Sequence, residues 1–263
     1  MHRALILAGG ITVFWLIESA VPFIRFNYNK WQHARINIFF TLTTIIVNFV
    51  LAFFLLKTAN WTTENHFGIL NWLPKMSVFL YALIGLLLLD LIGAYLVNFV
   101  EHKVKFLWRF HLIHHTDNWI DTTSANRHHP GESVIRFIFT IVGVLIIGAP
   151  MWMVFLYQTL SVIATQFNHA NIVLPKKLDV LLSYFIVSPD MHKVHHHYVL
   201  PYTDSNYGNI FSVWDRLFGT FMTLEREEII YGIDTHMNTD ENNNLNNLLQ
   251  IPFQDYNDIN ISK

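Results

Sequence analysis

The 263-residue chain contains no cysteine, and only 14% of its residues are charged. The lack of cysteine excludes a disulfide framework and thiolate metal sites, although it does not indicate a cellular compartment. The formal net charge of −2, with no basic stripe among the aromatic residues, argues against a nucleic-acid partner. Phosphate-binding, dinucleotide-binding and haem-attachment motifs are also absent from the sequence. Cofactors held by those motifs are therefore excluded.

Apolar residues are abundant instead. They make up 52% of the chain, which has 22 Phe, 8 Trp and a mean hydropathy of +0.33. The surface of a soluble protein of this size would not accommodate so much apolar area. The first apolar run lacks a small-residue cleavage site and is followed by others, so we expect a membrane anchor rather than a signal peptide. The composition predicts an integral membrane protein.

The apolar runs predict an all-α protein with about four transmembrane helices. The first three cover residues 4–24, 36–56 and 76–99, each near the roughly 20 residues that span a bilayer. The fourth run, residues 134–165, is broken by Gly148-Ala149-Pro150. Each arm of roughly 14 residues would rise only about 21 Å, less than the bilayer core. We therefore expect this last run to form a bent hairpin with both ends on one side.

The loop after the first run carries Arg25, Lys30 and Arg35, which predicts that this loop is cytoplasmic. The third run returns to that side, so the histidines that follow it should form a cytoplasmic helical cap. We divide the chain into N-terminal transmembrane helices (1–75), a His-rich domain (76–222) and a polar C-terminal tail (223–263). The Asn-rich tail is expected to be peripheral and partly ordered at best.

Two stretches of the His-rich domain place histidines at positions i, i+3 and i+4. They are His111, His114 and His115, and then His192, His195 and His196. In a helix these positions share one face. Neutral imidazoles are good ligands for Zn, Cu, Fe or Ni, whereas protonating close neighbours together is opposed by repulsion. A polar face with incidental histidines explains two equal triplets poorly, so metal binding is predicted. His197 should point away from this face.

For several other residues the sequence allows two interpretations of their role. Asp90 lies inside an expected span, where it either orients a ligating imidazole or makes a packing hydrogen bond to a neighbouring helix. One of His128 and His129 joins the site, or both are capping or surface residues. Ser188 or Asp190 suits the N-cap of the second His helix.

Residues 85–222 resemble the fatty acid hydroxylase / sterol desaturase superfamily of membrane-bound, histidine-rich di-iron oxygenases. The resemblance is carried by Asp90, Tyr95, His102, 107–115, 127–130, His169-Ala-Asn171, 189–196, Asn206-Tyr-Gly208 and 214–220. It implies two iron ions, O2 as co-substrate, a lipid substrate of sterol or fatty-acyl type, and a separate electron-donor protein. The implied ligands are His102, His111, His114, His115, His129, His169, His192, His195 and His196, with Asn98, Asp90 and Asp215 as weak ligands or supporting residues.

The sequence departs from this family at Asn98, where the first histidine of the first box would stand. Asn98 shares a helix face with His102, but an amide is a poorer ligand than imidazole. A catalytically inactive relative is therefore one alternative, and a membrane metal-binding or transport protein is another. Transporters tend to place ligands near the bilayer midplane, whereas these histidines follow the ends of the expected spans. The resemblance implies either hydroxylation or desaturation of the lipid.

Overall fold

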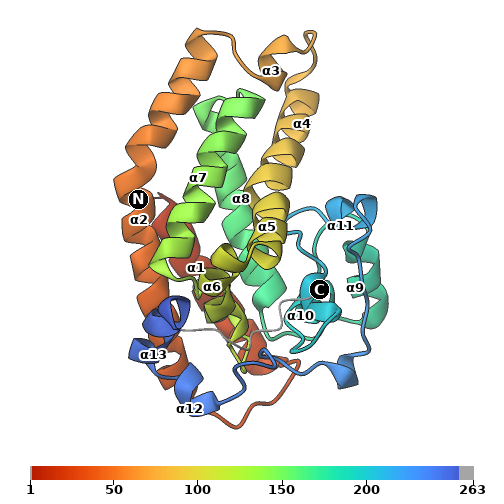
Figure 1. Cartoon of the computed structure of the whole chain (residues 1–263). Coiled ribbons are helices and arrows are strands. Elements are labelled where there is room, and N and C mark those ends of the chain that lie inside the picture. The colour runs from red at the N-terminus through yellow and green to blue at the C-terminus, as the bar shows by residue number, and fades with distance from the viewer. Residues whose placement is uncertain (1, 255–263) are drawn as a thin grey trace.

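The computed structural model describes residues 2–254, and within this range every regular element is a helix. This confirms the all-α expectation. An upright bundle stands over a cap of shorter helices (Figure 1). The bundle contains α1 (His2–Ala20), α2 (Lys30–Glu64), α4 (Val78–Asp90) with its continuation α5 (Val97–Lys103), α7 (Pro130–Ile147) and α8 (Met151–His169). The short α3 (Ile69–Trp72) lies at the end away from the cap.

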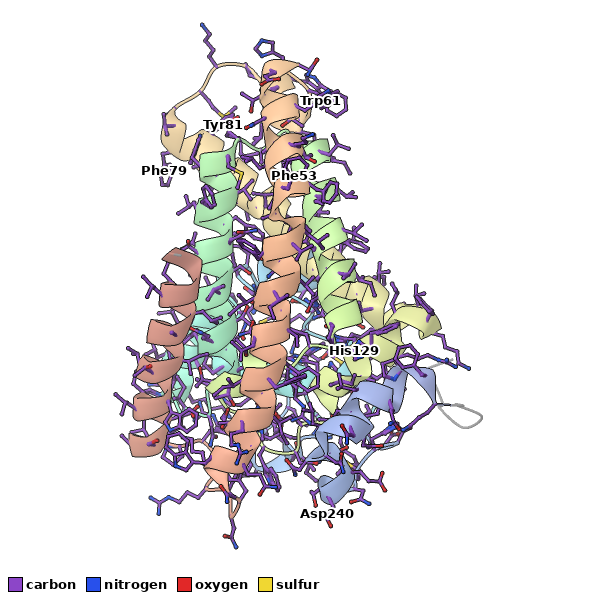
Figure 2. The ribbon with its side chains drawn as sticks, turned by 90° about the vertical axis from the view of Figure 1, so that its left-hand side faces the viewer. Phe53, Trp61, Phe79, Tyr81, His129 and Asp240 are labelled. Atoms are coloured by element: carbon purple, nitrogen blue, oxygen red, sulfur yellow. The ribbon has the colours of Figure 1, made fainter. Side chains whose placement is uncertain are left out.

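Three segments of the described chain are long and apolar enough to cross a membrane. They are Lys30–Trp72, Val78–Lys103 and Pro130–Ile147, and Leu5–Ala20 is a shorter apolar helix. The outer surface of the upper bundle is apolar, because Phe49, Phe53 and Phe79 are 82%, 57% and 77% exposed. Figure 2 shows Phe53 and Phe79 on this upper half. Such exposure suits a hydrocarbon environment rather than water.

The chain reverses between α7 and α8, so that both helices reach the cap at their far ends (Figure 1). Gly148 ends α7 with a left-handed φ of 71°, where a Cβ would lie 2.3 Å from the carbonyl oxygen of Phe67. The expected bent hairpin is present, but its helices contain 18 and 19 residues. The prediction of about 14 was too short because polar turns extend both helices toward the cap.

α4 continues into α5 through a π-helical turn, η1 (Leu91–Leu96). Asp90 lies just before this turn and accepts hydrogen bonds from the backbone N–H groups of Ile210 and Phe211 at 3.2 and 3.1 Å. It therefore holds a loop rather than an imidazole or a neighbouring helix. π-helical turns are rare and often occur at functional sites. The turn ends immediately before α5, which carries Asn98 and His102 into the cap.

The cap is built from short helices connected by loops. Its α-helices are α6 (Lys105–His115), α9 (Lys176–Ser183), α10 (Pro189–His195), α11 (Val213–Leu217), α12 (Thr239–Asn242) and α13 (Leu245–Gln250). Its 3-10 helices are η2 (Thr122–Asn126), η3 (Tyr202–Asp204), η4 (Arg226–Glu228) and η5 (Ile251–Phe253). Ser188 caps α10 by accepting from the N–H of Met191 at 3.3 Å, so of the two expected capping residues Ser188 is the one that acts.

The C-terminal segment packs more closely than expected. Leu248 and Ile251 are fully buried against Trp108 and Leu112 of α6. In addition, the buried Arg127 donates to the carbonyl oxygen of Asn242 at 2.6 Å. Residues up to 254 are thus part of the cap, because a few apolar side chains among the asparagines form one buried helix face. The segment is thus ordered up to residue 254, whereas 255–263 lie outside the described residues, and the division into domains stays a prediction.

Candidate metal centre

Four buried histidines form the first group, which we call cluster A. They are His102 from α5, His111 and His115 from α6, and His195 from α10. The Nε2 atoms of His102 and His115 are 3.1 Å apart, and those of His115 and His111 are 3.2 Å apart. One ring nitrogen from each residue lies within 4.8 Å of all the others. Three helices therefore direct four imidazoles at a single point.

Four further buried histidines form cluster B. They are His114 from α6, His169 from the end of α8, and His192 and His196 from α10 and its C-cap. The Nε2 atom of His169 lies 3.1 Å from those of His114 and His192 and 3.3 Å from that of His196. This second point of convergence has the same composition as the first.

The two clusters are adjacent because α6 and α10 face each other. α6 sends His111 and His115 to cluster A and His114 to cluster B. The rings of His115 and His196, one from each cluster, stack with centroids 4.7 Å apart. Each triplet is thus divided between two sites, and each site takes histidines from both helices.

Hydrogen bonds behind the rings orient several of these imidazoles. The Nδ1 atoms of His169 and His195 lie 2.8 and 2.7 Å from the carbonyl oxygens of Thr165 and Ser205. A carbonyl oxygen can only accept, so each Nδ1 carries the proton and each Nε2 presents a lone pair to its cluster. His102 and His111 are held in the same way by the carboxylates of Asp204 and Glu132, at 3.1 and 2.8 Å. Such outer partners orient metal-binding histidines.

The two clusters fit metal ions. A tetrahedral ion with nitrogen ligands at about 2.0–2.1 Å has ligand atoms about 3.3 Å apart, and the closest Nε2 pairs here are 3.1–3.3 Å apart. In cluster A the Nε2 lone pairs of His102, His111 and His195 converge in a buried site where His115 is the one ring that could donate, and a cation removes the cost of this arrangement. Burial lowers the pKa of His111 to about 3 even though Glu132 opposes this. The pKa of His114 is held well below its usual value, mainly by burial and secondly by repulsion from the neighbouring His196. These imidazoles are neutral at pH 7 and available as ligands.

The structure does not bring His129 into either cluster. Its Nδ1 accepts from the N–H of Gly131 at 3.0 Å and caps α7, and its ring packs on Phe110 and Phe253. Figure 2 shows it on the flank of the cap, beside the C-terminal helices. His128 points inward instead, and its ring stacks on His114 at a centroid distance of 4.7 Å. Because α7 begins at Pro130, the N-cap position turns His129 outward.

The expected supporting residues act on a loop rather than on imidazoles. Asp215 accepts from the N–H groups of Tyr207 and Gly208 at 2.8 and 2.9 Å. Asn98 donates to the carbonyl oxygen of Tyr207 at 3.1 Å, and its own Oδ1 has no partner among the described residues. The Tyr207 ring in turn packs on His102, with centroids 5.1 Å apart. With Asp90, these residues fix the loop that covers cluster A. His197 also lies outside the clusters, since its Nδ1 accepts from the N–H of Ile230 at 3.1 Å.

Three charged residues beside cluster A were missed by the sequence reading. Arg136 bonds Glu101 at 2.7 Å and Glu132 at 2.9 Å. Glu132 also lies 2.8 Å from Nδ1 of His111 and 2.7 Å from Nδ1 of His128. A signal was available, because ionisable residues near or within apolar helices are costly and usually functional. Glu132 and Arg136, four residues apart at the start of an apolar helix, meet this criterion.

Two neighbouring cavities, which share part of their lining, lie between the clusters and the outer surface. The first, which we call the chamber, has a volume of about 160 Å³ and is lined by His111 and His114, His169 and His192, and Tyr207. The second, the groove, has a volume of about 650 Å³ and is lined mainly by apolar residues of α2 and α8. Six residues line both: Thr44, Asn48, Asn126, Phe137, Gln158 and Val162. These six residues form a throat between the two cavities.

Comparison with known proteins gives a consistent set of matches. The fatty acid hydroxylase family model matches residues 82–220, more than half of the chain. The ornithine lipid hydroxylase OlsE of Rhizobium tropici is 25% identical over 159 residues, covering 60% of this chain and 45% of that protein. Alkylglycerol monooxygenases of Danio rerio and Homo sapiens are 29% and 27% identical, covering 55% and 57% of this chain.

The chain spans less than half the length of these relatives, with 31% and 32% of the two alkylglycerol monooxygenases covered. No solved structure matches the chain.

Proposed function

Because this chain belongs to the fatty acid hydroxylase family, we propose that it is an oxygen-dependent lipid hydroxylase or desaturase that holds two iron ions. The observation that carries the proposal is the pair of adjacent four-imidazole clusters. Eight neutral ring nitrogens exceed the four to six ligands of one ion. Imidazole binds several transition metals, and the family favours iron.

The chemistry of the substrate supports a metal-based oxidant. Hydrocarbon C–H bonds do not react with side-chain acids, bases or nucleophiles, so their oxidation takes a metal or organic cofactor with oxygen. Bound iron would supply the activation of O2. For hydroxylation the balance is one C–H bond, one O2, two electrons and two protons, giving one alcohol and one water. We propose that a separate electron-donor protein supplies the electrons.

The residues around the clusters would position the reaction. Glu132 and the carbonyl oxygen of Ser205 hold the rings of His111 and His195 with their Nε2 atoms inward. The buried cap shields both clusters from bulk water, since all eight histidines have at most 5% of their surface exposed. The chamber lies beside His111 and His114. A substrate carbon in the chamber would therefore lie next to both clusters.

A lipid substrate agrees with the position of the groove. The groove lies among helices with exposed apolar side chains, and its volume falls within the range of roughly 300–1,000 Å³ common for ligand sites. The relatives are named for an ornithine lipid and for alkylglycerols. We propose that a membrane lipid enters sideways between α2 and α8.

We further propose that the cap faces the cytoplasm. Lys30 and Arg35 lie at the start of α2, at the cap end of the bundle, and basic residues are enriched on the cytoplasmic side. Reporters fused after Thr116 and after Asn171 should register on the same side. A different side for each would contradict the hairpin topology, and both outside would reverse the orientation.

The activity is tested by lipid mass spectrometry of cells that express the wild type or His114→Ala. We expect the wild type alone to produce a lipid that has gained one oxygen or lost two hydrogens. Elemental analysis of iron-loaded protein should give two equivalents of iron per chain. Two metal ions without any lipid product would favour a metal-binding protein or an inactive relative. One equivalent or less would count against the dinuclear site.

A further inference from the structure

The throat between the groove and the chamber contains three unpaired carboxamides. Asn48 comes from α2, Asn126 from η2 and Gln158 from α8, and all three line both cavities. None of the three side-chain amides forms a hydrogen bond with another described residue. Several hydroxyls and amides beside them are paired, as in the 2.8 Å contacts of Thr44 with Ser133 and of Asn209 with Ser161. The throat therefore offers hydrogen-bond donors and acceptors that have no protein partner, between the groove and the chamber.

All three carboxamides are half-buried, and the groove on their outer side is mostly apolar. A lipid that fills the groove would displace water from these amides, and they would then need hydrogen bonds from the ligand itself. Ligand sites commonly combine apolar walls with a few polar groups that fix the orientation of the ligand. Three amides from separate elements around one throat match this arrangement. The expected ligand therefore has hydrogen-bonding groups that lie in the throat.

The charges around the path restrict the ligand further. Among the described residues that line the chamber, Arg136 alone carries a permanent charge, and Glu101 and Glu132 neutralise it at 2.7 and 2.9 Å. The lining of the groove contains no charged residue. Neither a phosphate nor a carboxylate would find a free cationic side chain here. The side chains of the lining are thus suited to an uncharged polar group, and any additional positive charge would come from the proposed metal ions behind the histidines.

The volume of the chamber sets the size of that group. Its volume is about 160 Å³, and a cavity of roughly 150 Å³ accommodates benzene, a molecule of six heavy atoms. At the inner wall, the buried Oδ1 of Asn98 and hydroxyl of Tyr207 have no partner among the described residues. The chamber thus fits a small group with several hydroxyls or amides, about the size of a glycerol unit.

Building on the proposed function, we propose that Asn48, Asn126 and Gln158 select lipids with a small, uncharged, hydrogen-bonding end. That end enters the chamber and the chain remains in the groove. The oxidised carbon is consequently at or near the polar end, next to clusters A and B, rather than in the middle or at the tip of the chain. Sites that hydrogen-bond a ligand discriminate strongly against analogues without the polar group.

Equilibrium binding tests this selection without requiring turnover. The probes are radiolabelled 1-hexadecanoylglycerol, hexadecanoic acid and hexadecane, added to the metal-loaded full chain in detergent micelles. We expect the wild type to bind the glycerol ester more tightly than the other two. Asn48→Leu and Gln158→Leu should each reduce the preference over hexadecane by about fivefold to tenfold, the usual effect of one neutral hydrogen bond.

Thr159→Val is the matched control, because Thr159 lines the groove but not the throat. It should leave the preference unchanged. If Gln158→Leu reduces the yield of folded protein, Gln158→Met keeps the side-chain length and carries the same expectation. Equal preference in wild type and both amide variants would overturn the proposal, as would a wild type that prefers the acid or hexadecane.

Product analysis separates this proposal from the proposed function. Selective binding with no oxidised product in the presence of reductant and O2 would refute the oxygenase but retain the selection by the throat. Oxidation that is equally selective in wild type and amide variants would retain the oxygenase and refute the selection. An oxidised carbon at the far end of the chain would also overturn the placement of the polar end in the chamber.

Discussion

Glu132 accepts a 2.8 Å hydrogen bond from Nδ1 of His111 and so fixes the tautomer of a cluster A imidazole. The carboxylate comes from α7, whereas the imidazole comes from α6. The negative charge of Glu132 is balanced by Arg136, whose Nε lies 2.9 Å from the carboxylate. The first turn of a bundle helix thus controls the orientation of a ring in the cap.

Glu132→Gln should weaken metal binding at cluster A by roughly 10- to 100-fold, the usual effect of losing a partner behind a metal ligand. The glutamine retains the size of the side chain but not the charge that favours Nδ1–H of His111. Competition with a chelator of known iron affinity measures the effect. Glu227→Gln, at an exposed position, should match the wild type. An unchanged affinity for Glu132→Gln would show that His111 does not depend on this carboxylate.

His114→Ala and His129→Ala should differ, although both histidines belong to the His-rich segments. His114 points into cluster B, so its removal should release one metal equivalent and abolish activity. His129 caps α7, and loss of a cap costs about 0.5–2 kcal/mol. We expect His129→Ala to lower the melting temperature but to retain both ions. Loss of an ion in His129→Ala, by elemental analysis, would instead support the role that the family resemblance implied.

The metal-free protein should become less stable as the pH falls below about 6.5. Burial lowers the pKa of His111 to about 3 and holds those of His114 and His195 well below the usual value. The unfolded chain takes up protons near pH 6.5, while the folded chain does so only at lower pH. Stability is thus fully present above pH 6.5 and is lost as the pH falls toward 3. Melting temperatures of apoprotein in detergent between pH 7.5 and 4.5 would measure this loss, and a flat profile would contradict it.

Leu248→Ala should destabilise the cap by about 2–5 kcal/mol, the range for truncating a buried leucine. Leu248 is fully buried against α6, so metal should also be released at a lower temperature. Asn246→Ala changes an exposed position of the same helix and should have an effect within about 0.5 kcal/mol. Thermal denaturation with metal release monitored in parallel gives both quantities. Similar curves for the two variants would mean that the C-terminal helices do not support the centre.

Helical spacing was sufficient to identify the six histidines of α6 and α10, because their periodicity is local. The division of each triplet between two clusters was not predictable, since it depends on α6 and α10 facing each other in the folded cap. The choice between His128 and His129 depended on where α7 begins, and helix boundaries are poorly defined by sequence. Asp90 shows a similar limit. A carboxylate within an apolar run predicts a buried partner, but the partner proved to be a loop 120 residues away.

Residues far apart in the chain meet at cluster B. His114 and His169 are separated by 55 residues, and His169 and His192 by 23. A metal ion bound there would hold three distant parts of the chain together, and because the unfolded chain lacks this site, the free energy of metal binding would add to the free energy of folding. In a protein without cysteine, the ion would act as a reversible cross-link in place of a disulfide. If the ion is the proposed iron, its supply would govern how much of the cap is folded, and in cells short of iron proteases would remove more of the protein.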